Sequence, residues 1–153
     1  MTIEDDIAFL QRVPALAILG RDALRILAIG TENRYVHEGV TLFGEGEQAD
    51  GAYVVQEGSF ELVKRDNGAA TVVGPGALIG EVALISQTRR PVSAVAREPS
   101  SVVRIPRQLF LKVLESDPDA ALRMRDAVAA RVNQTATEFA RVRAGLAGGV
   151  IRK

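Results

Sequence analysis

The stretch of this sequence with the most chemical content has two glycines ahead of an acidic residue and a pair of arginines behind it. It reads Gly-Ala-Leu-Ile-Gly-Glu-Val-Ala-Leu over residues 76–84, and Arg89 and Arg90 follow a few positions later. Glycines that lead into a helical turn leave backbone N–H groups free to face an anion. A nearby arginine adds a planar set of donors that matches phosphate oxygens. The pattern predicts an anion site around a short helical turn that begins at Glu81.

Glu81 indicates what kind of anion this would be. A carboxylate beside an anion is repulsive unless it accepts a hydrogen bond from the ligand, as it would from a sugar hydroxyl. Phosphate and hydroxyl together in one small site indicate a nucleotide. The simpler interpretation is a glycine turn with one surface ion pair, and these residues alone leave both open.

The first thirty residues predict N-terminal helices that precede the site. Apolar residues recur there at helical spacing in two runs. They are Ile3, Ile7 and Leu10 in the first run, and Leu24, Leu27 and Ala28 in the second. Gly30 follows at a position where helices commonly end.

Residues 31–106 predict the β-rich core that would hold the site. Short strand-forming runs alternate with turns such as Glu57-Gly58 and Asp66-Asn67-Gly68, and residues 77–90 interrupt the strands. Many short strands at even spacing are typical of barrels, sandwiches and jelly rolls. The predicted fold class is α+β: an antiparallel β-roll or jelly roll (double-stranded β-helix) flanked by N-terminal helices and a long C-terminal helix.

Residues 107–146 predict a return to helix, and 147–153 a solvated tail. A short helix over 107–114 precedes a long one that starts at Asp117-Pro118. The long helix carries a heptad stripe with one polar member: Val128, Val132, Thr135, Phe139, Val142 and Leu146. So narrow a stripe favours a homodimer seam through 121–146, with packing on the chain's own β-roll as the alternative.

Composition narrows the classes of function. The chain has 153 residues, 19 Lys plus Arg against 19 Asp plus Glu, no cysteine and a single histidine, His37. Balanced charge gives no overall basic field for nucleic acid or anionic lipid. The N-terminus does not resemble a secretion signal, and every apolar run is far shorter than the roughly 20 residues of a membrane span. We therefore expect a cytoplasmic protein with no membrane insertion.

Metal binding and catalysis lack the residues they need. A metal-dependent cupin shares jelly-roll geometry but requires several converging histidines or acids, and His37 stands alone as a barrel residue. The sequence has no histidine-based triad with a cysteine, no Gly-x-Ser-x-Gly motif and no Walker phosphate loop. We expect no enzyme, no catalytic residues, no metal and no cofactor.

The stretch from Val36 to Leu114 resembles the cyclic-nucleotide-binding family, the regulatory module of bacterial catabolite activators, protein kinase regulatory subunits and cyclic-nucleotide-gated channels. The matching segments occur in the family's order: residues 43–46, residues 53–62, residues 80–84 with Arg90 nine positions after Glu81, and residues 104–107 with Phe110. The resemblance implies that Arg90 pairs with the cyclic phosphate, Glu81 accepts from the ribose 2′-OH, and Gly80 lets the sugar approach. It also implies that the pocket is walled by Val82, Ala83 and Leu84.

Pro91 and Val92, which follow Arg90, bear on the ligand that the resemblance implies. Val92 has no donor or acceptor in its side chain, which favours cAMP over cGMP, the other candidate. Pro91 stands where the family usually has Ala or Ser with an N–H near the phosphate, and proline lacks that donor. A hydrogen bond to a charged group is worth roughly 1.5–3 kcal/mol, so affinity would fall about tenfold to a hundredfold unless Arg89 compensates.

The C-terminal zone resembles the dimerising helix of the catabolite-activator branch. Thr135 falls where that branch places a hydroxyl on adenine, although Ala136 replaces a second hydroxyl, and a tolerated polar residue in a weak seam is the alternative. A helix–turn–helix domain follows this helix in the branch, and no recognition helix fits in residues 147–153. We expect no direct DNA binding, unless the sequence is a fragment of a transcription regulator.

Two functional hypotheses remain. In one, the domain binds a cyclic nucleotide and signals through its C-terminal helix to an unidentified protein effector. In the other, the pocket is degenerate and the fold is a ligand-independent dimerisation or interaction module. Pro91 favours the second hypothesis, whereas Glu81, Arg90 and Thr135 together favour the first, which we prefer.

Overall fold

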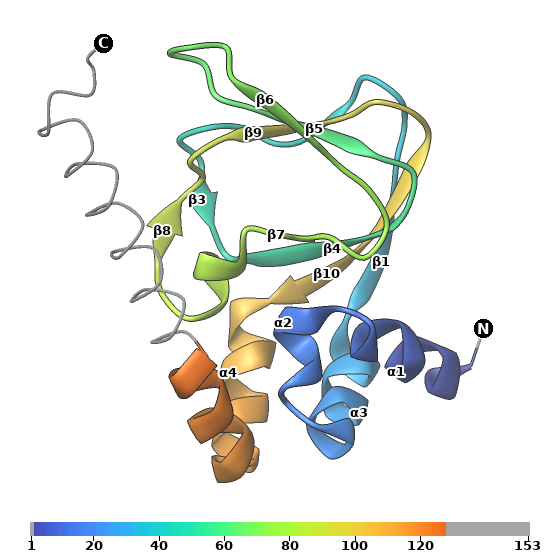
Figure 1. Cartoon of the computed structure of the whole chain (residues 1–153), viewed down its shortest axis with the longest axis vertical. Helices are drawn as coiled ribbons and strands as arrows, with labels where there is room; N and C mark the ends of the chain where they lie inside the picture. The colour runs from blue at the N-terminus through green and yellow to red at the C-terminus, as the bar shows by residue number, and fades with distance from the viewer. Residues whose placement is uncertain (1, 128–153) are drawn as a thin grey trace, which may run out of the picture.

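The computed structural model describes residues 2–127, in which helices precede and follow a roll of antiparallel strands (Figure 1). The helices before the roll are α1 (Ile3–Gln11), α2 (Pro14–Ala17) and α3 (Arg21–Gly30). After the roll come α4 (Arg107–Ser116) and a further helical segment at 118–127. Thr135, most of the predicted dimer seam and the predicted tail lie outside the described residues.

Within residues 2–127 the strands form two four-stranded sheets and one short pair, and every pairing is antiparallel. The first sheet has the order β1-β10-β4-β7, the second β2-β9-β5-β6, and β3 pairs with β8. The bounds are β1 (Glu32–Val36), β2 (Thr41–Phe43), β3 (Gln48–Ala49), β4 (Gly51–Glu57), β5 (Phe60–Val63), β6 (Ala70–Val73), β7 (Leu78–Ile79), β8 (Thr88–Arg89), β9 (Ser93–Ala96) and β10 (Ser100–Pro106). The predicted α+β fold with an antiparallel β-roll is confirmed.

The central strand β4 is buried on both faces and so separates two hydrophobic cores. Its side chains alternate, as strand geometry requires. Ala52 and Val54 pack in a core shared with the helices, whereas Tyr53 and Val55 pack inside the roll. We call these the helix-side core and the roll core. The side of the sheet that a residue faces therefore determines whether it packs against the helices or inside the roll.

The helices gather against the outer face of the first sheet, at one end of the molecule (Figure 1). The apolar faces predicted for the N-terminal helices are buried there, with Ile7, Leu24 and Leu27 fully inaccessible to solvent. Phe110 of α4 is 1% exposed in the same core, which ties the helices on the two sides of the roll to each other.

Residues 77–90 contain more regular structure than the sequence pattern predicts. The expected helical turn at Glu81 is present as a 3₁₀ helix, η1 (Glu81–Leu84). The strands β7 and β8 flank it, and each has two residues. A strand of two residues is too short to show the alternation of apolar and polar residues that identifies a strand. The sequence pattern therefore predicts a break in the strands, whereas in the structure β7 pairs with β4 and β8 pairs with β3.

Candidate functional site

The connection from β7 to η1 depends on Gly80. Its backbone has φ 78° and ψ 35°, the left-handed conformation that glycine adopts at little cost. The turn then closes with the N–H of Ala83 donating to the carbonyl of Gly80 at 3.1 Å. The predicted glycine turn therefore exists, and η1 begins directly after it.

Arg90 follows β8 directly and is buried, with 4% of its surface exposed. Backbone hydrogen bonds hold it on both sides: its N–H donates to the carbonyl of Glu47, and its carbonyl accepts from the N–H of Gly46, both at 2.8 Å. Its guanidinium carbon lies 4.3 Å from the centre of the Phe43 ring and 5.7 Å from that of Tyr53. Aromatic faces attract cations, so these rings fix the guanidinium inside the roll.

The Nη1 atom of Arg90 is buried and has no hydrogen-bond acceptor in the described structure. Burial lowers the pKa of this guanidinium, although the nearby Tyr53, Asp50 and Glu47 partly offset the effect. The group nevertheless stays protonated at physiological pH, as arginines do. A buried cation with an unused donor is costly, and an anion bound at Nη1 would remove that cost.

Gly80 and Arg90 are brought into contact although they are ten residues apart. A Cβ atom added to Gly80 would lie 2.3 Å from Nη1 of Arg90, which is closer than real atoms approach. The glycine of the turn and the arginine thus border one site. Glu81, next in the chain, is partly buried beside them.

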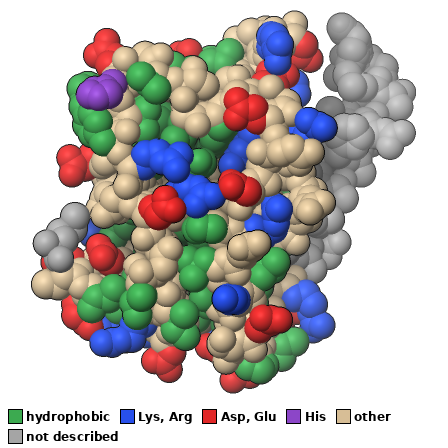
Figure 2. All heavy atoms as spheres, turned by 180° about the vertical axis from the view of Figure 1, so that it is seen from behind, with side chains coloured by type: hydrophobic (Ala, Val, Ile, Leu, Met, Phe, Trp, Pro, Cys, Tyr) green, Lys and Arg blue, Asp and Glu red, His purple; other side chains and the backbone are tan. Residues whose placement is uncertain are grey.

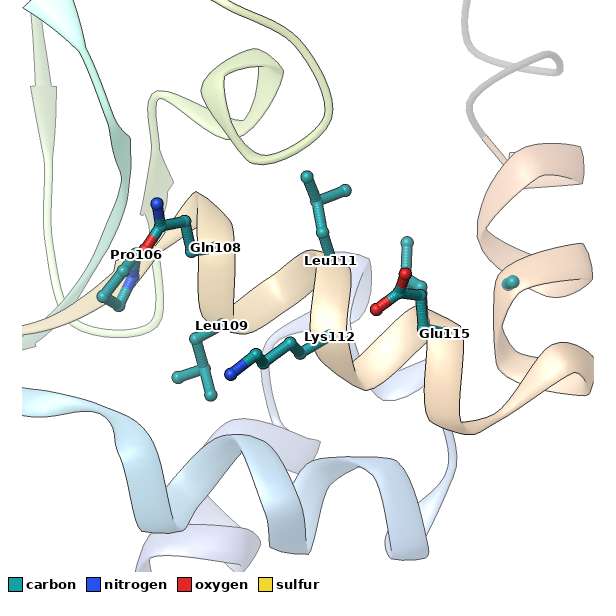
Figure 3. Close-up of a pocket in the computed structure, with 8 residues that line it drawn as sticks. Pro106, Gln108, Leu109, Leu111, Lys112 and Glu115 are labelled. Carbon is teal, nitrogen blue, oxygen red and sulfur yellow. The ribbon is translucent and has the colours of Figure 1, made fainter.

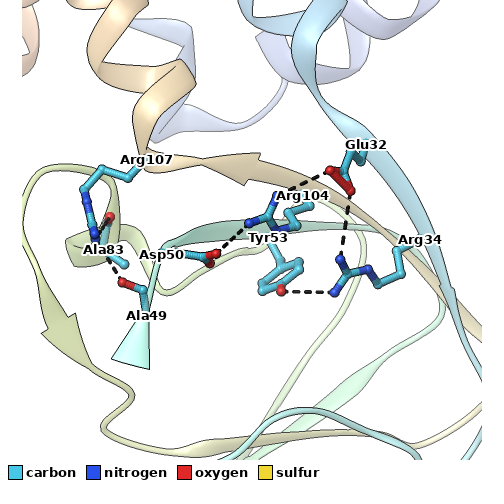
Figure 4. Close-up of polar contacts among 8 residues, drawn as sticks. All are labelled: Glu32, Arg34, Ala49, Asp50, Tyr53, Ala83, Arg104 and Arg107. Carbon is cyan, nitrogen blue, oxygen red and sulfur yellow. Dashed lines mark hydrogen bonds and ion pairs between the residues drawn. The ribbon is translucent and has the colours of Figure 1, made fainter. Parts of the chain in front are cut away.

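A polar network of arginines and carboxylates lies along the first sheet (Figure 4). Arg104 of β10 pairs with Asp50 at 2.7 Å and with Glu32 at 3.4 Å. Arg34 of β1 lies 3.9 Å from Glu32 and donates to the Tyr53 hydroxyl at 3.3 Å. The same tyrosine ring that faces Arg90 is therefore held at its far end by a second arginine.

Arg107, the first residue of α4, holds η1 in place (Figure 4). Its Nη1 donates to the carbonyls of Ala49, Ala83 and Ser86 at 2.9, 3.1 and 3.2 Å. Its backbone N–H donates to the carbonyl of Asp50 at 2.7 Å. A cation is unfavourable in the first turn of a helix, so this placement indicates a specific use of the side chain. One residue joins β3, η1 and α4.

The other predicted site residues do not share one environment. Val82 is 57% exposed and Ala83 is buried. Leu84 is buried in the helix-side core, not in the roll core. Pro91 is exposed, and Val92 packs on the roll core. The structure thus places Val92 nearest to the interior of the roll and Val82 on the surface.

Sequence patterns did not single out Phe43, Tyr53, Asp50 and Arg104 as parts of this site. Phe43 and Tyr53 fall in segments that carried the family resemblance, without a role assigned to either. Arg104 pairs across the sheet with Tyr53, and residues directly opposite in a sheet share a face. The register of β4 with β10 brings Tyr53 and Arg104 together, and this register cannot be read from the sequence.

Among the described residues, Nη1 of Arg90 is the one buried side-chain polar atom without a hydrogen-bond partner. Seen from behind, basic and acidic side chains lie intermingled across the middle of the molecule (Figure 2). A hollow along α4 is lined by Leu111, Lys112 and Glu115, among others, and Leu111 points toward the segment of η1 (Figure 3). Within residues 2–127 no group of three His, Cys, Asp or Glu side chains could hold a metal ion, and no helix is long and apolar enough to cross a membrane.

A family model described as the cyclic nucleotide-binding domain matches residues 33–117, more than half of the chain. The chain belongs to this family. The matched range runs from within β1 to the end of α4 and includes η1 and Arg90.

Known relatives place the domain in longer proteins. An uncharacterized NTE family protein of Mycobacterium tuberculosis is 31% identical over 126 residues, which cover 82% of this chain and 22% of the relative. The chain thus spans about a fifth of the length of that curated relative.

Two solved structures are similar to the described fold. A cyclic nucleotide-binding-like protein from Brucella abortus is 39% identical, with a TM-score of 0.65 over 72% of this chain and 98% of that one. The N-terminal domain of a transcriptional regulator from Streptomyces coelicolor is 29% identical, with a TM-score of 0.77 over 86% of this chain and 94% of that one. Each of the two matches includes nearly all of the solved chain, so the similarity extends over whole domains.

Proposed function

We propose that this domain binds a cyclic nucleotide, cAMP in preference to cGMP, and acts as a regulatory module without catalytic activity. The observation that carries the proposal is the Nη1 atom of Arg90. It is buried against Gly80, it is held by two aromatic rings, and it has no acceptor among residues 2–127. A phosphate oxygen is an acceptor of the right charge for such a donor.

The side chains around Arg90 suit the rest of a cyclic nucleotide. Glu81 sits one residue after Gly80 and would accept from the ribose 2′-OH. Gly80 lacks the Cβ that would exclude the sugar from this corner. Val92, which packs on the roll core, offers the base an apolar surface without a donor or acceptor. This lack of hydrogen-bonding groups is the reason for preferring cAMP to cGMP.

Signalling would pass from η1 to the helices that follow the roll. Arg107 connects η1 to α4, and the helical segment at 118–127 continues from there. A bound nucleotide signals only if it has different affinities for two positions of these helices. We place the domain in the cytoplasm as a homodimer through 121–146, with Thr135 toward the base and an unidentified protein effector reading the helix. The proposal includes no DNA contact and no membrane insertion.

The experiment that tests the proposal is calorimetric titration with cAMP and with cGMP. We expect micromolar or tighter binding of cAMP by the unmodified chain. Arg90→Ala should cost roughly 2–5 kcal/mol of affinity, at least about thirtyfold in Kd, because it removes a buried partner of the phosphate. Arg89→Ala is the matched control: Arg89 is exposed and donates to the carbonyl of Gly46, so the affinity should change little.

Pro91 favours one alternative function. It has no N–H to offer a phosphate, and it is exposed directly beside Arg90. In this alternative the fold is a ligand-independent dimerisation or interaction module. No heat and no thermal shift with either nucleotide would favour it, and a wild-type affinity in Arg90→Ala would contradict the assigned site.

A further inference from the structure

The carboxylate of Asp50 is already engaged by an arginine other than Arg90. Its Oδ2 lies 2.7 Å from Nη2 of Arg104, and Nη1 of Arg104 lies 3.4 Å from Glu32. The Arg104 side chain is 17% exposed, whereas that of Asp50 is 70% exposed. The pair therefore has a partly buried cation with two acidic neighbours, which is stronger than an isolated surface pair.

Arg104 lies on the same face of the first sheet as the ligand site. It pairs across the sheet with Tyr53, and Val102, two residues earlier on the same strand, is buried in the roll core with that tyrosine. Residues two apart on a strand face the same way. Arg104 thus points toward the interior of the roll, where Arg90 faces the ring of Tyr53.

The charge of the Asp50 carboxylate acts on both arginines. Asp50 raises the pKa of Arg90 and Arg104 lowers it, so both charges act on the Arg90 guanidinium. Despite burial, the pKa of Arg104 is raised, chiefly by its contact with Asp50. Within residues 2–127, Arg90 forms no ion pair at all, while Arg104 forms two. Asp50 is thus paired with Arg104, whereas Arg90, the arginine that contacts Gly80, has no carboxylate partner among residues 2–127.

We propose that Arg104 is a positioning residue for nucleotide affinity: it holds the Asp50 carboxylate away from Arg90 and so keeps the Arg90 guanidinium available to the phosphate of the ligand. Without Arg104, Asp50 turns to Arg90, and a ligand must then displace an internal anion. The inference rests on the proposed function, because the ligand it concerns is the cyclic nucleotide at Arg90.

A double-mutant cycle with cAMP as the probe tests the inference. Arg104→Gln should weaken cAMP binding by about tenfold or more, because it frees a competing carboxylate and removes a positive charge near the site. Asp50→Asn alone should leave the affinity unchanged or raise it. The double variant should recover most of what Arg104→Gln loses, which is a coupling that a purely structural role does not produce.

Two variants serve as controls. Arg25→Gln removes an exposed arginine that pairs with Glu4 on the N-terminal helices, away from the roll, and it should bind cAMP nearly as the unmodified chain does. Arg104→Lys keeps the charge and should retain most of the affinity, which makes the test independent of whether Arg104→Gln folds well. A large loss of affinity in Asp50→Asn, or a double variant weaker than Arg104→Gln, would overturn the inference.

A crystal structure of nucleotide-free Arg104→Gln separates this inference from the proposed function. We expect the Asp50 carboxylate within about 4 Å of the Arg90 guanidinium, the usual limit for an ion pair. An Asp50 that stays away from Arg90 there contradicts the inference whatever the chain binds. If the unmodified chain binds neither cAMP nor cGMP, the proposed function fails, and the position of Asp50 still decides whether Arg104 holds it.

Discussion

Gly80 and Arg90 determine each other's geometry. The left-handed backbone of Gly80, with φ 78°, brings its Cα so close to the guanidinium that a Cβ would stand 2.3 Å from Nη1 of Arg90. The atom nearest to that absent Cβ is the same Nη1 that has no acceptor. Glycine is thus required at position 80 twice, by the backbone conformation and by the arginine.

Gly80→Ala should therefore abolish detectable cAMP binding and destabilise the fold. A left-handed non-glycine residue costs about 1–2 kcal/mol, and the displaced guanidinium adds to this cost. Calorimetry and denaturant unfolding measure the two effects. Gly76→Ala is the matched control, since Gly76 has φ 91° but nothing within 4 Å of its Cβ position. Gly76→Ala should lower the stability through backbone strain but should still bind cAMP. Equal cAMP binding by both variants would contradict the importance of the contact between residue 80 and Arg90.

Phe43→Leu should weaken cAMP binding several-fold. The ring centre lies 4.3 Å from the Arg90 guanidinium carbon, and a buried cation–π contact is worth up to about 2 kcal/mol. Leucine fills much of the same volume without attracting the cation. Tyr53→Phe is the control, because it keeps the other ring and removes just the hydroxyl that accepts from Arg34. Calorimetry on both variants checks this, and an unchanged Phe43→Leu would show that the ring does not orient Arg90.

The sequence was sufficient to predict the parts of the site that lie within one short segment. Gly80, Glu81 and the turn of η1 are adjacent, so the motif itself carries their local geometry. The apolar spacing of α1 and α3 likewise predicted the buried faces, because a helix face depends on residues three and four apart.

The surroundings of Arg90 could not be predicted in the same way. Phe43 lies 47 positions before Arg90, and Asp50 and Arg104 are 54 residues apart. Their contacts depend on the registers of β10 with β4 and of β8 with β3, which are set by tertiary packing. Leu84 shows the same limit: the family resemblance implied a pocket wall, and the structure buries this side chain in the helix-side core.

The capping box of α1 should make stability depend on pH in the acidic range. The Thr2 N–H donates to Oδ2 of Asp5 at 3.1 Å, and this hydrogen bond, helped by the Thr2 hydroxyl, lowers the pKa of Asp5 below its ordinary value of 3.8. A lowered folded-state pKa gives stability that is present above 3.8 and is lost as the pH falls through the folded value. Asp5→Asn should thus lower the Tm at neutral pH, with a difference that disappears in strong acid. Asp6→Asn, a neighbouring acid outside the box, should show a smaller effect, and equal Tm changes for both would contradict the role of the box.

Arg107→Met should loosen η1 and leave the roll intact. The variant removes the donor that serves the carbonyls of Ala83 and Ser86, and hydrogen bonds from a charged group are worth roughly 1.5–3 kcal/mol. Relief of an unfavourable cation in the first turn of α4 returns about 0.3–1 kcal/mol, so the net loss of stability should be roughly 1–2 kcal/mol. Hydrogen exchange at the amides of Ile85 and Ser86, which close the end of η1, should accelerate.

Lys112→Met provides the comparison for Arg107→Met on the same helix. Lys112 is exposed and its side chain makes no hydrogen bond or ion pair within residues 2–127, so neither unfolding nor exchange should change. If exchange at the two amides is equally slow in both variants, Arg107 is not what holds η1 to α4. If it accelerates in Arg107→Met alone while the amides of β4 stay protected, the arginine is the mechanical link between the ligand site and the helices that would carry its signal.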